Sequence, residues 1–263
     1  MEFKIAILGT GNVAWHLSGA LESAGHIITE VYGRNLQHAE KITDRLYATE
    51  AKDDLDFSES EAEIFILAVC DQAIASLADA VILPEGSILV HTSGSMPLEI
   101  LGYSSASYTG ILYPLQSFSK HHRLDFSDVA LLLESDDADT LKKLRKLAGS
   151  LKSPHYTVKS KDRKAVHVAA VFASNFTNHL IGIAEGIMER QSLDFEMLKP
   201  LIIEQISKAL EIGATRAQTG PALREDLDTL ESHHHFLQYD EQLAEIYRII
   251  SQNILDASSS RGF

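Results

Sequence analysis

Cysteine is nearly absent from this sequence, and positive charge is scarce. Cys70 is the only cysteine among 263 residues, so the chain forms no intrachain disulfide and no cysteine-rich zinc site. There are 23 lysines and arginines against 37 acidic residues, which gives a formal net charge of -14. Nucleic acids and anionic membranes attract clustered basic side chains. We therefore expect neither of them to be a partner.

Long hydrophobic runs are also missing. No apolar run approaches the roughly 20 residues that a membrane-spanning helix needs, and the start of the chain lacks the features of a signal peptide. We therefore expect a cytoplasmic protein. What the chain does contain, 45% hydrophobic and 23% charged residues, is typical of a globular protein, and its length is enough for two domains.

Short apolar runs alternate with helical patterns over residues 1–158, and we interpret this part as one domain. The alternation predicts a doubly wound, Rossmann-like α/β fold, with a parallel sheet and helices on both of its faces. Strands are expected over 3–8, 27–32, 62–69, 87–91, 110–113, 129–133 and 155–158, with helices over 12–24, 36–46, 72–83 and 137–151.

Strand patterns stop after Lys159, and residues 159–263 are predicted to form an all-helical domain. Helical periodicity is present over 162–190, 195–217, 223–230 and 239–256.

A glycine motif follows the first predicted strand. Gly9 allows a tight turn, Gly11 lets the backbone approach a pyrophosphate, and the small Ala14 allows the helix to pack closely on the strand. Free N–H groups at the helix start would bind the anion. The alternative is a glycine turn without a ligand. We expect five residues here to bind a dinucleotide: Gly9, Thr10, Gly11, Asn12 and Val13.

The end of the second predicted strand indicates which dinucleotide is bound. Enzymes that use NAD commonly carry an acidic residue here, which accepts a hydrogen bond from the ribose 2′-hydroxyl. This chain instead has Arg34, and a guanidinium pairs with a 2′-phosphate. We therefore predict NADP as the cofactor. The alternative is a solvated arginine on the following helix.

Two loops after buried strands are expected to line the nicotinamide half of this site, because ligands of doubly wound sheets bind at the carboxyl ends of the strands. For Cys70 the favoured alternative is a small buried side chain. For His91 and Ser93 the alternative of turn formation is about as well supported as ligand binding. The segment 113–118 either closes the same crevice or forms a plain loop. The expected lining residues are Val69, Cys70, His91, Thr92 and Ser93.

Polar side chains recur at helical spacing in the second half. His167, Ser174, Asn178 and Glu185 share one stripe of an α-helix, with Asn175 about 80° to the side. The stripe faces either a cleft or a partner helix. The histidine run at 233–235 lacks the spacing of metal ligands, so we predict no metal site.

Together these motifs resemble a family of candidate NADP-dependent oxidoreductases, in which a Rossmann-like domain precedes a helical domain of unknown function. The resemblance rests on GTGNVA, HTSGS, YPLQSF, HVAAVFASNFTN and TGPALRED. The first domain is also similar to those of pyrroline-5-carboxylate reductase, deazaflavin-dependent NADP oxidoreductases and β-hydroxyacid dehydrogenases. The resemblance implies a second domain like the C-terminal domain of 6-phosphogluconate dehydrogenase, a crevice between the domains, and a homodimer built through the helices.

Two functions fit these patterns. The first is an NADPH-dependent reductase that transfers a hydride to a small carbonyl or imine substrate, with His167 as the general acid and Asn175 or Asn178 polarising the acceptor. The second is a protein that binds NADP(H) and senses its redox state without turnover. A variant of the first replaces the substrate with a deazaflavin or a prephenate-like acid.

Overall fold

The structure is a computed structural model in which residues 2–259 are described, so the last residues of the predicted helical domain lie outside the described part. The chain divides into two compact units, of which the first ends at Leu180 and the second begins at Ile181. The sheet belongs to the first unit, and its last strand ends at Thr157. The sheet thus ends one residue before the predicted domain boundary at 158, the first unit extends into the following helix, and the boundary stays a prediction.

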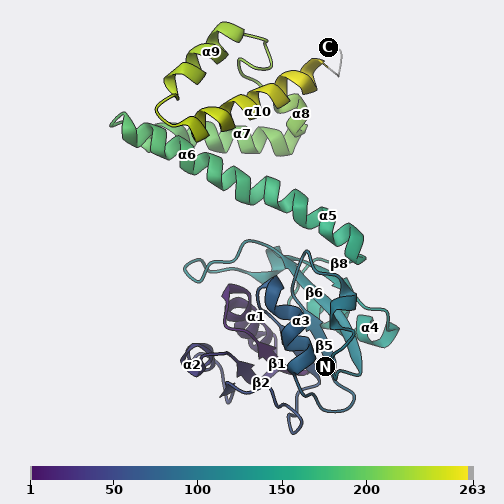
Figure 1. Cartoon of the computed structure of the whole chain (residues 1–263). Helices are drawn as coiled ribbons and strands as arrows, with labels where there is room; N and C mark the ends of the chain where they lie inside the picture. The colour runs from purple at the N-terminus through teal and green to yellow at the C-terminus, as the bar shows by residue number, and fades with distance from the viewer. Residues whose placement is uncertain (1, 260–263) are drawn as a thin grey trace. The chain divides into compact units, whose positions relative to one another are not determined.

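One sheet forms the centre of the first unit (Figure 1). It has eight strands in the order β3-β2-β1-β4-β5-β6-β7-β8. All neighbouring strands are parallel except β6 and β7, so the expectation of a parallel sheet is wrong at this pair. The connection from β6 to β7 contains only a short helical turn, η2, Phe126–Asp128, instead of the crossover helix that a parallel pair needs. The strands are β1 Lys4–Leu8, β2 Ile27–Tyr32, β3 Glu50–Lys52, β4 Ile64–Leu67, β5 Ile88–His91, β6 Tyr108–Leu115, β7 Ala130–Glu134 and β8 His155–Thr157.

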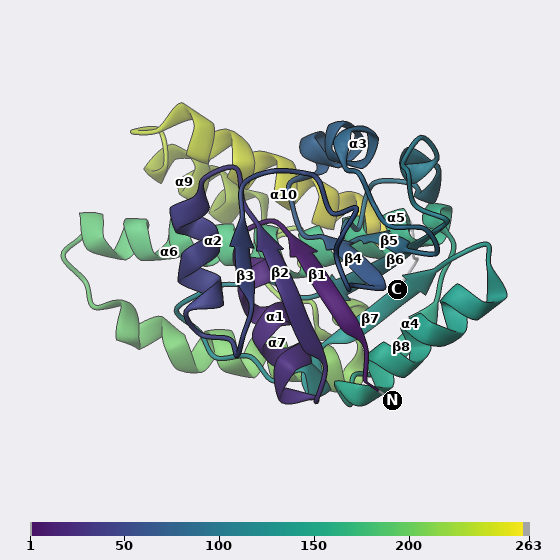
Figure 2. The same cartoon turned by 90° about the horizontal axis from the view of Figure 1, so that it is seen from below.

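Helices cover both faces of the sheet, as the near-continuous apolar strands predict. On one face, α1 (Asn12–Ser23), α2 (Leu36–Thr43) and α4 (Ala138–Ser150) pack against alternate residues of the strands. On the other face, α3 (Asp71–Ala80) and the short helix η1 (Leu98–Leu101) cover the remaining strand residues. Figure 2 shows β3, β2 and β1 side by side, with α2 and α1 nearby. The doubly wound fold predicted from the sequence is confirmed.

The order of the strands fixes where a ligand can bind. The chain winds outward from β1 to β2 and β3, then returns to place β4 on the opposite side of β1. Loops at the carboxyl ends of β1 and β4 therefore diverge and leave a crevice between them. Both predicted binding loops lie here, the one that starts at Gly9 and the one at Ala68–Gln72.

A π-helical segment interrupts the long helix that follows the sheet. Helix α5 (Ser160–Ala170) leads directly into η3 (Val171–Phe176), a π-helix, and then into α6 (Thr177–Arg190). A π-helix closes i→i+5 bonds instead of i→i+4 bonds, which changes the rotation per residue. The predicted stripe assumed one α-helical phase from His167 to Glu185, and that phase is not kept.

The second unit is helical, as expected, but its helices begin and end differently from the prediction. Gly213, with a φ of 91°, interrupts the predicted 195–217 helix, and Asp226 caps a helix that starts at Leu227 instead of 223. The elements are η4 Phe195–Leu198, α7 Lys199–Ile212, α8 Ala214–Ala217, α9 Leu227–Phe236 and α10 Glu241–Ser259. In the part of the chain that the structure describes, no helix is long and apolar enough to span a bilayer.

Candidate functional site

The glycine turn after β1 is held tightly against the end of β4. Gly9 has a φ of 132°, and a Cβ atom at this position would lie 2.2 Å from the carbonyl oxygen of Ala68. Only glycine combines this backbone angle with that contact. Ala14, on the first turn of α1, is fully buried against the sheet. Gly9 therefore forms the tight turn and Ala14 packs closely on the sheet, as the small size of both residues predicts. Together they bring the turn close to the β4 loop.

A second close approach places Arg34 beside the turn. A Cβ atom on Gly33 would lie 2.7 Å from Cγ2 of Thr10, so the chain leaving β2 passes directly over the glycine turn. Arg34 follows with an exposed side chain. Within residues 2–259 its guanidinium forms no ion pair. It is thus available to an anionic ligand.

These loops enclose a pocket of about 600 Å³, within the size range of cofactor sites. Of the residues predicted to bind the cofactor, the pocket brings together Gly9, Thr10, Gly11, Asn12, Val13, Arg34, Val69 and Cys70. Gln116 and Phe118 also line it, and they belong to the segment 113–118, for which closing the crevice was one of two expectations. The rest of the lining was not assigned from the sequence: Tyr32, Gly33, Ala68, Ala73, Ser76 and Leu77.

The backbone of the pocket supplies hydrogen-bond donors. Helices α1 and α3 both start at its edge, and neither has a side chain capping its first turn. By contrast, Asn35 caps α2 and Asp137 caps α4. Free N–H groups and the positive end of a helix dipole are the groups that bind phosphate oxygens. The residues present therefore fit the pyrophosphate of a dinucleotide.

Cys70 is exposed at the rim of this pocket. The favoured alternative, a buried structural cysteine, is wrong because β4 ends at Leu67 and Cys70 already lies in the loop before α3.

The loop after β5 lies inside the protein and does not line the pocket. His91, Thr92 and Ser93 are all buried. The Ser93 N–H donates to Nδ1 of His91 at 3.1 Å, and Nε2 of His91 lies 3.4 Å from the carbonyl oxygen of Pro97. Burial and the nearby positive charge of Arg163 lower the pKa of His91 to about 4, so this histidine is neutral at pH 7. Its contacts organise the loop, and a role in cofactor binding stays a prediction.

A tyrosine and histidine pair lies beside this loop. The hydroxyl of Tyr113, in β6, is 2.9 Å from Nδ1 of His167, in α5. Gly94 packs against both rings, because a Cβ atom there would lie 2.6 Å from Nδ1 of His167 and 2.7 Å from Cζ of Tyr113. Loop, strand and helix therefore meet at one point. Nε2 of His167 takes part in no hydrogen bond among residues 2–259.

Sequence reasoning identified His167 but missed Tyr113. The expected strand ended at Tyr113, and segment 113–118 was expected either to close the crevice or to form a plain loop, whereas β6 continues to Leu115. Burial raises the pKa of Tyr113, so its hydroxyl keeps its proton at neutral pH. The signal was present in the sequence, since a tyrosine at the carboxyl end of a central strand faces the same edge as the glycine turn.

A buried arginine fixes where α5 meets the sheet. Arg163 is fully buried, and its guanidinium forms an ion pair with Glu134 and donates to the carbonyl oxygen of Met96. Ser160 donates to the same carboxylate through its backbone N–H and its hydroxyl, each at 2.8 Å. Because His167 follows Arg163 by one helical turn, this cluster positions the imidazole.

The predicted asparagines are not gathered around this pair. Asn175 lies in the π-helix η3 and Asn178 in the first turn of α6, and both are exposed. Neither forms a side-chain hydrogen bond with His167 or Tyr113 within the described chain. Their part in the site stays a prediction.

Comparisons with known proteins agree with this arrangement. A Rossmann-like domain model matches residues 1–115, and a model described as Domain of unknown function (DUF2520) matches residues 129–254. A candidate NADP oxidoreductase from Bacteroides fragilis is 31% identical over 97% of this chain and 98% of that one, with a TM-score of 0.89. The chain belongs to this family of Rossmann-like proteins with a DUF2520 domain. No curated protein matches the sequence.

More distant structures share the fold of this DUF2520 family member. A reductive aminase from Aspergillus terreus, solved with NADPH and ethyl-5-oxohexanoate, is 12% identical over 98% of this chain and 95% of its own, with a TM-score of 0.72. A 1-pyrroline-5-carboxylate reductase from Streptococcus pyogenes is 13% identical over 98% and 99%, with a TM-score of 0.63. The fold is thus shared with a reductive aminase solved with NADPH and with a pyrroline-carboxylate reductase.

The neutral, buried state of His91 predicts an acid-sensitive fold. Between pH 6.5 and about 4 the unfolded histidine binds a proton and the folded one does not, so the free energy of unfolding should fall as the pH is lowered through this window, by about 3 kcal/mol in total. Urea unfolding at a series of pH values measures this, and His91→Gln should flatten the slope. An equal slope in the variant would contradict the assignment.

Proposed function

We propose that the protein is an NADPH-dependent reductase acting on a small carbonyl or imine compound. The observation that carries the proposal is the Tyr113 and His167 pair, a proton-carrying group at the same edge of the sheet as the glycine-turn pocket. Enzymes that reduce such compounds need both a hydride source and a proton source. Fold likeness to a reductive aminase and a pyrroline-carboxylate reductase supports the reaction class.

The pocket residues would bind the dinucleotide. The uncapped starts of α1 and α3 would bind its pyrophosphate, Arg34 its 2′-phosphate, and Val69 and Cys70 would lie toward the nicotinamide. NADPH supplies a hydride to the substrate carbon when bound. Val69 and Leu77 contribute apolar surface that keeps water away.

The proton would come from His167. Its Nδ1 is occupied by the Tyr113 hydroxyl, so Nε2 is the ring nitrogen left for a substrate. A hydroxyl both donates and accepts, so Tyr113 can hold the ring in one orientation before and after the proton leaves. Transfer of the Nε2 proton to the substrate oxygen or nitrogen completes the reduction. Asn175 or Asn178 would polarise the acceptor group.

The second candidate is a sensor that binds NADP(H) without turnover. The exposed Cys70 at the pocket rim favours it, because a thiol beside a nicotinamide could report redox state to a partner. The two candidate functions differ in the role of His167, because the reductase needs it as a proton donor and the sensor does not. For both candidate functions we propose a cytoplasmic location, where a lone exposed thiol stays reduced.

Substitution of Arg34 tests the choice of cofactor. Arg34→Ala should weaken NADPH binding about 10- to 100-fold, since a charge-assisted contact contributes about 1.5 to 3 kcal/mol, and should leave NADH binding unchanged. Calorimetric titration with both cofactors measures this. Lys41→Ala is the control, because Lys41 is an exposed cation on α2, the helix that follows Arg34, and does not line the pocket. Equal affinity of the native protein for NADH and NADPH would refute the 2′-phosphate assignment.

Substitution of the acid pair tests the reaction. His167→Gln should lower kcat about 100-fold or more with a panel of ketones and imines, because general acids contribute about 10² to 10⁴ in rate. Tyr113→Phe should have a smaller effect, since it removes only the group that orients the ring. NADPH affinity should persist in both variants. A kcat unchanged by His167→Gln would remove this residue from the mechanism.

We also propose that the protein is a homodimer formed through its helical half. In the described part of the second unit, the buried apolar side chains are only Ala217, Ala222, Leu237 and Ala244. So small a core does not stabilise some 80 residues on its own. Large apolar side chains remain exposed on η4 and α7 of this unit, among them Met197, Leu201, Ile203, Ile206 and Leu210. A second copy offers the same apolar surface and would cover them.

Light scattering coupled to gel filtration tests the assembly. The native chain should elute with twice its mass of 29.0 kDa. Leu210→Glu places a charge on the most exposed of these helix side chains, at 83%, and should yield monomer or aggregate. Tyr103→Glu, on a residue of the sheet unit that is exposed to a similar degree, at 90%, should leave the dimer intact. A monomeric native protein would rule out the proposal.

A further inference from the structure

A second pocket of the sheet unit lies beside α1 and shares no lining residue with the dinucleotide pocket. Its volume is about 1010 Å³, and we call it the basic groove. Four separate segments form it: α1, the turn after α2, the loop 120–126 and the end of α4. Its basic side chains are Arg45, Lys120, Arg123 and Lys152, accompanied by His16, His121 and His122.

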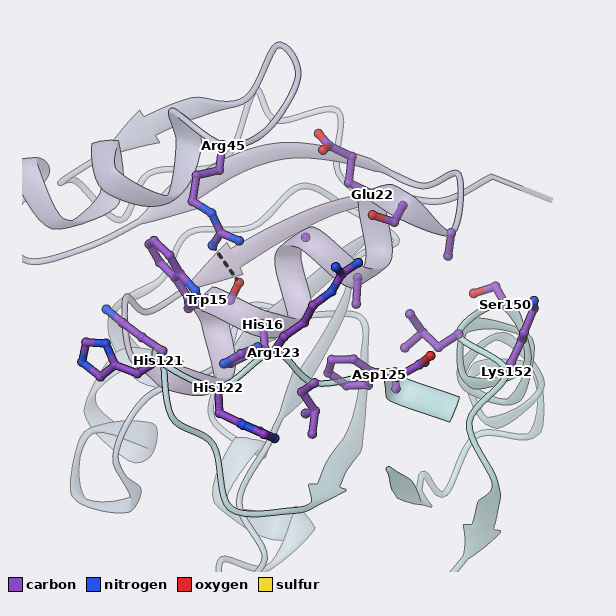
Figure 3. A pocket seen from close by; sticks show the side chains of 18 residues that line it. Trp15, His16, Glu22, Arg45, His121, His122, Arg123, Asp125, Ser150 and Lys152 are labelled. Carbon is purple, nitrogen blue, oxygen red and sulfur yellow. Dashed lines mark hydrogen bonds between the residues drawn. The ribbon is translucent and has the colours of Figure 1, made fainter. Parts of the chain in front are cut away.

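Trp15 forms the wall of the basic groove nearest the α2 turn. The Arg45 guanidinium lies 3.7 Å from the centre of the indole ring, and Nζ of Lys120 lies 5.1 Å from it. Arg45 also donates to the Trp15 carbonyl oxygen at 3.3 Å. Figure 3 shows Arg45 and Trp15 on one side, Lys152 on the opposite side, and Arg123 between them. Cations from both walls thus face one space.

The floor of the basic groove is built from small residues of α1. Gly19, Ala20, Ser23 and Ala24 line it. A Cβ atom on Gly19 would meet nothing closer than the Arg45 guanidinium, at 3.9 Å. The small side chains leave room for a ligand that reaches the cations.

The acidic residues of the basic groove already have partners. Glu22 accepts from the backbone N–H of Tyr47 at 2.6 Å. Asp125 accepts from the backbone N–H of Ser127 at 2.9 Å and caps a short helix. Hydrogen bonds from Ser127, and more weakly the charges of Lys152 and Arg123, lower the pKa of Asp125. Both acids are therefore satisfied without an ion pair to the groove cations.

Two of the cations are not held by a hydrogen bond or an ion pair among residues 2–259. Arg123 and Lys152 form neither a hydrogen bond nor an ion pair there through their side chains, and both are exposed. Their concentration contrasts with the whole chain, in which acidic residues outnumber basic ones by 37 to 23. Clustered cations repel one another, so a groove that collects them in an acidic protein gains from an anion.

The wall that carries Lys120 is held in place by α1. Asn12 donates to the carbonyl oxygen of Phe118 at 2.8 Å, and Nε2 of His16 lies 2.9 Å from that of Ser119. Lys120 itself donates to the carbonyl oxygen of Thr10 at 3.2 Å. The loop is therefore ordered before any ligand binds, which lowers the entropic cost of binding.

We propose that the basic groove binds a small polyanion, a molecule with at least two phosphate or carboxylate groups. Arg123 and Lys152 would contact its charged groups directly, and Arg45 would form a third contact from the Trp15 wall. The volume accommodates a ligand the size of a nucleotide or tricarboxylate. This site is independent of the reductase proposal, because the two pockets have separate linings.

Tripolyphosphate and citrate are the probes, and Trp15, the only tryptophan, reports their binding. Titration of the intact protein should change the Trp15 fluorescence with saturation, and calorimetry should give the stoichiometry. Arg123→Ala/Lys152→Ala should weaken binding about tenfold or more, since each charged contact contributes about 1.5 kcal/mol or more. Lys142→Ala/Lys161→Ala, which removes the same charge from exposed helix positions outside the groove, should leave the affinity unchanged. A preference for one probe identifies phosphate or carboxylate as the recognised group.

A second variant tests the site without removing a cation. Gly19→Glu places a carboxylate on the groove floor beside Arg45, at a helix position that accepts a side chain, and should abolish binding while retaining the thermal unfolding temperature. Saturating NADPH separates the two pockets, because binding in the basic groove should persist in its presence. Absence of binding by either probe would overturn the proposal, as would equal affinity of native protein and Arg123→Ala/Lys152→Ala, or displacement of the probe by NADPH.

Discussion

The buried ion pair between Arg163 and Glu134 is the contact on which the candidate reaction site depends. Arg163 bridges strand β7 and the loop before η1, and Ser160 donates a hydrogen bond to the same Glu134 carboxylate. A buried pair of this kind is costly to break, about 3 to 5 kcal/mol when one partner is lost. It fixes the first turn of α5 on the sheet. The position of His167, one turn later, follows from it.

Steric constraint plays the corresponding part in the dinucleotide pocket. The turn at Gly9 lies so close to Ala68, and Gly33 so close to Thr10, that a single methyl group would not fit at either glycine. These contacts bring the loops after β1, β2 and β4 together without any polar side chain. The pocket is therefore formed by backbone, which suits a ligand that is recognised by N–H groups. Gly94 has the same role between Tyr113 and His167.

Local patterns in the sequence predicted the fold well, and contacts between distant segments account for what they missed. Residues 27–32 were predicted as a strand to the residue, and the glycine motif, Arg34 and Val69 do share one pocket. The antiparallel β6 and β7 pair depends on pairing that no local pattern specifies. A prediction from helical periodicity assumes a constant angle per residue, so it could not detect the π-helix at 171–176. Burial of His91 and the contact of Tyr113 with His167 arise only when β5, β6 and α5 meet.

Deuterium transfer tests the central claim, that this protein reduces a substrate with NADPH and a protein proton. The protein would be incubated with NADPH deuterated at the reactive C4 position and a panel of ketones and imines, and the products analysed by mass spectrometry. The account predicts one deuterium on the former carbonyl or imine carbon of at least one product, formed about 100-fold more slowly by the His167→Gln variant than by the native protein. Tight NADPH binding with no deuterium in any product would contradict it and favour the sensor.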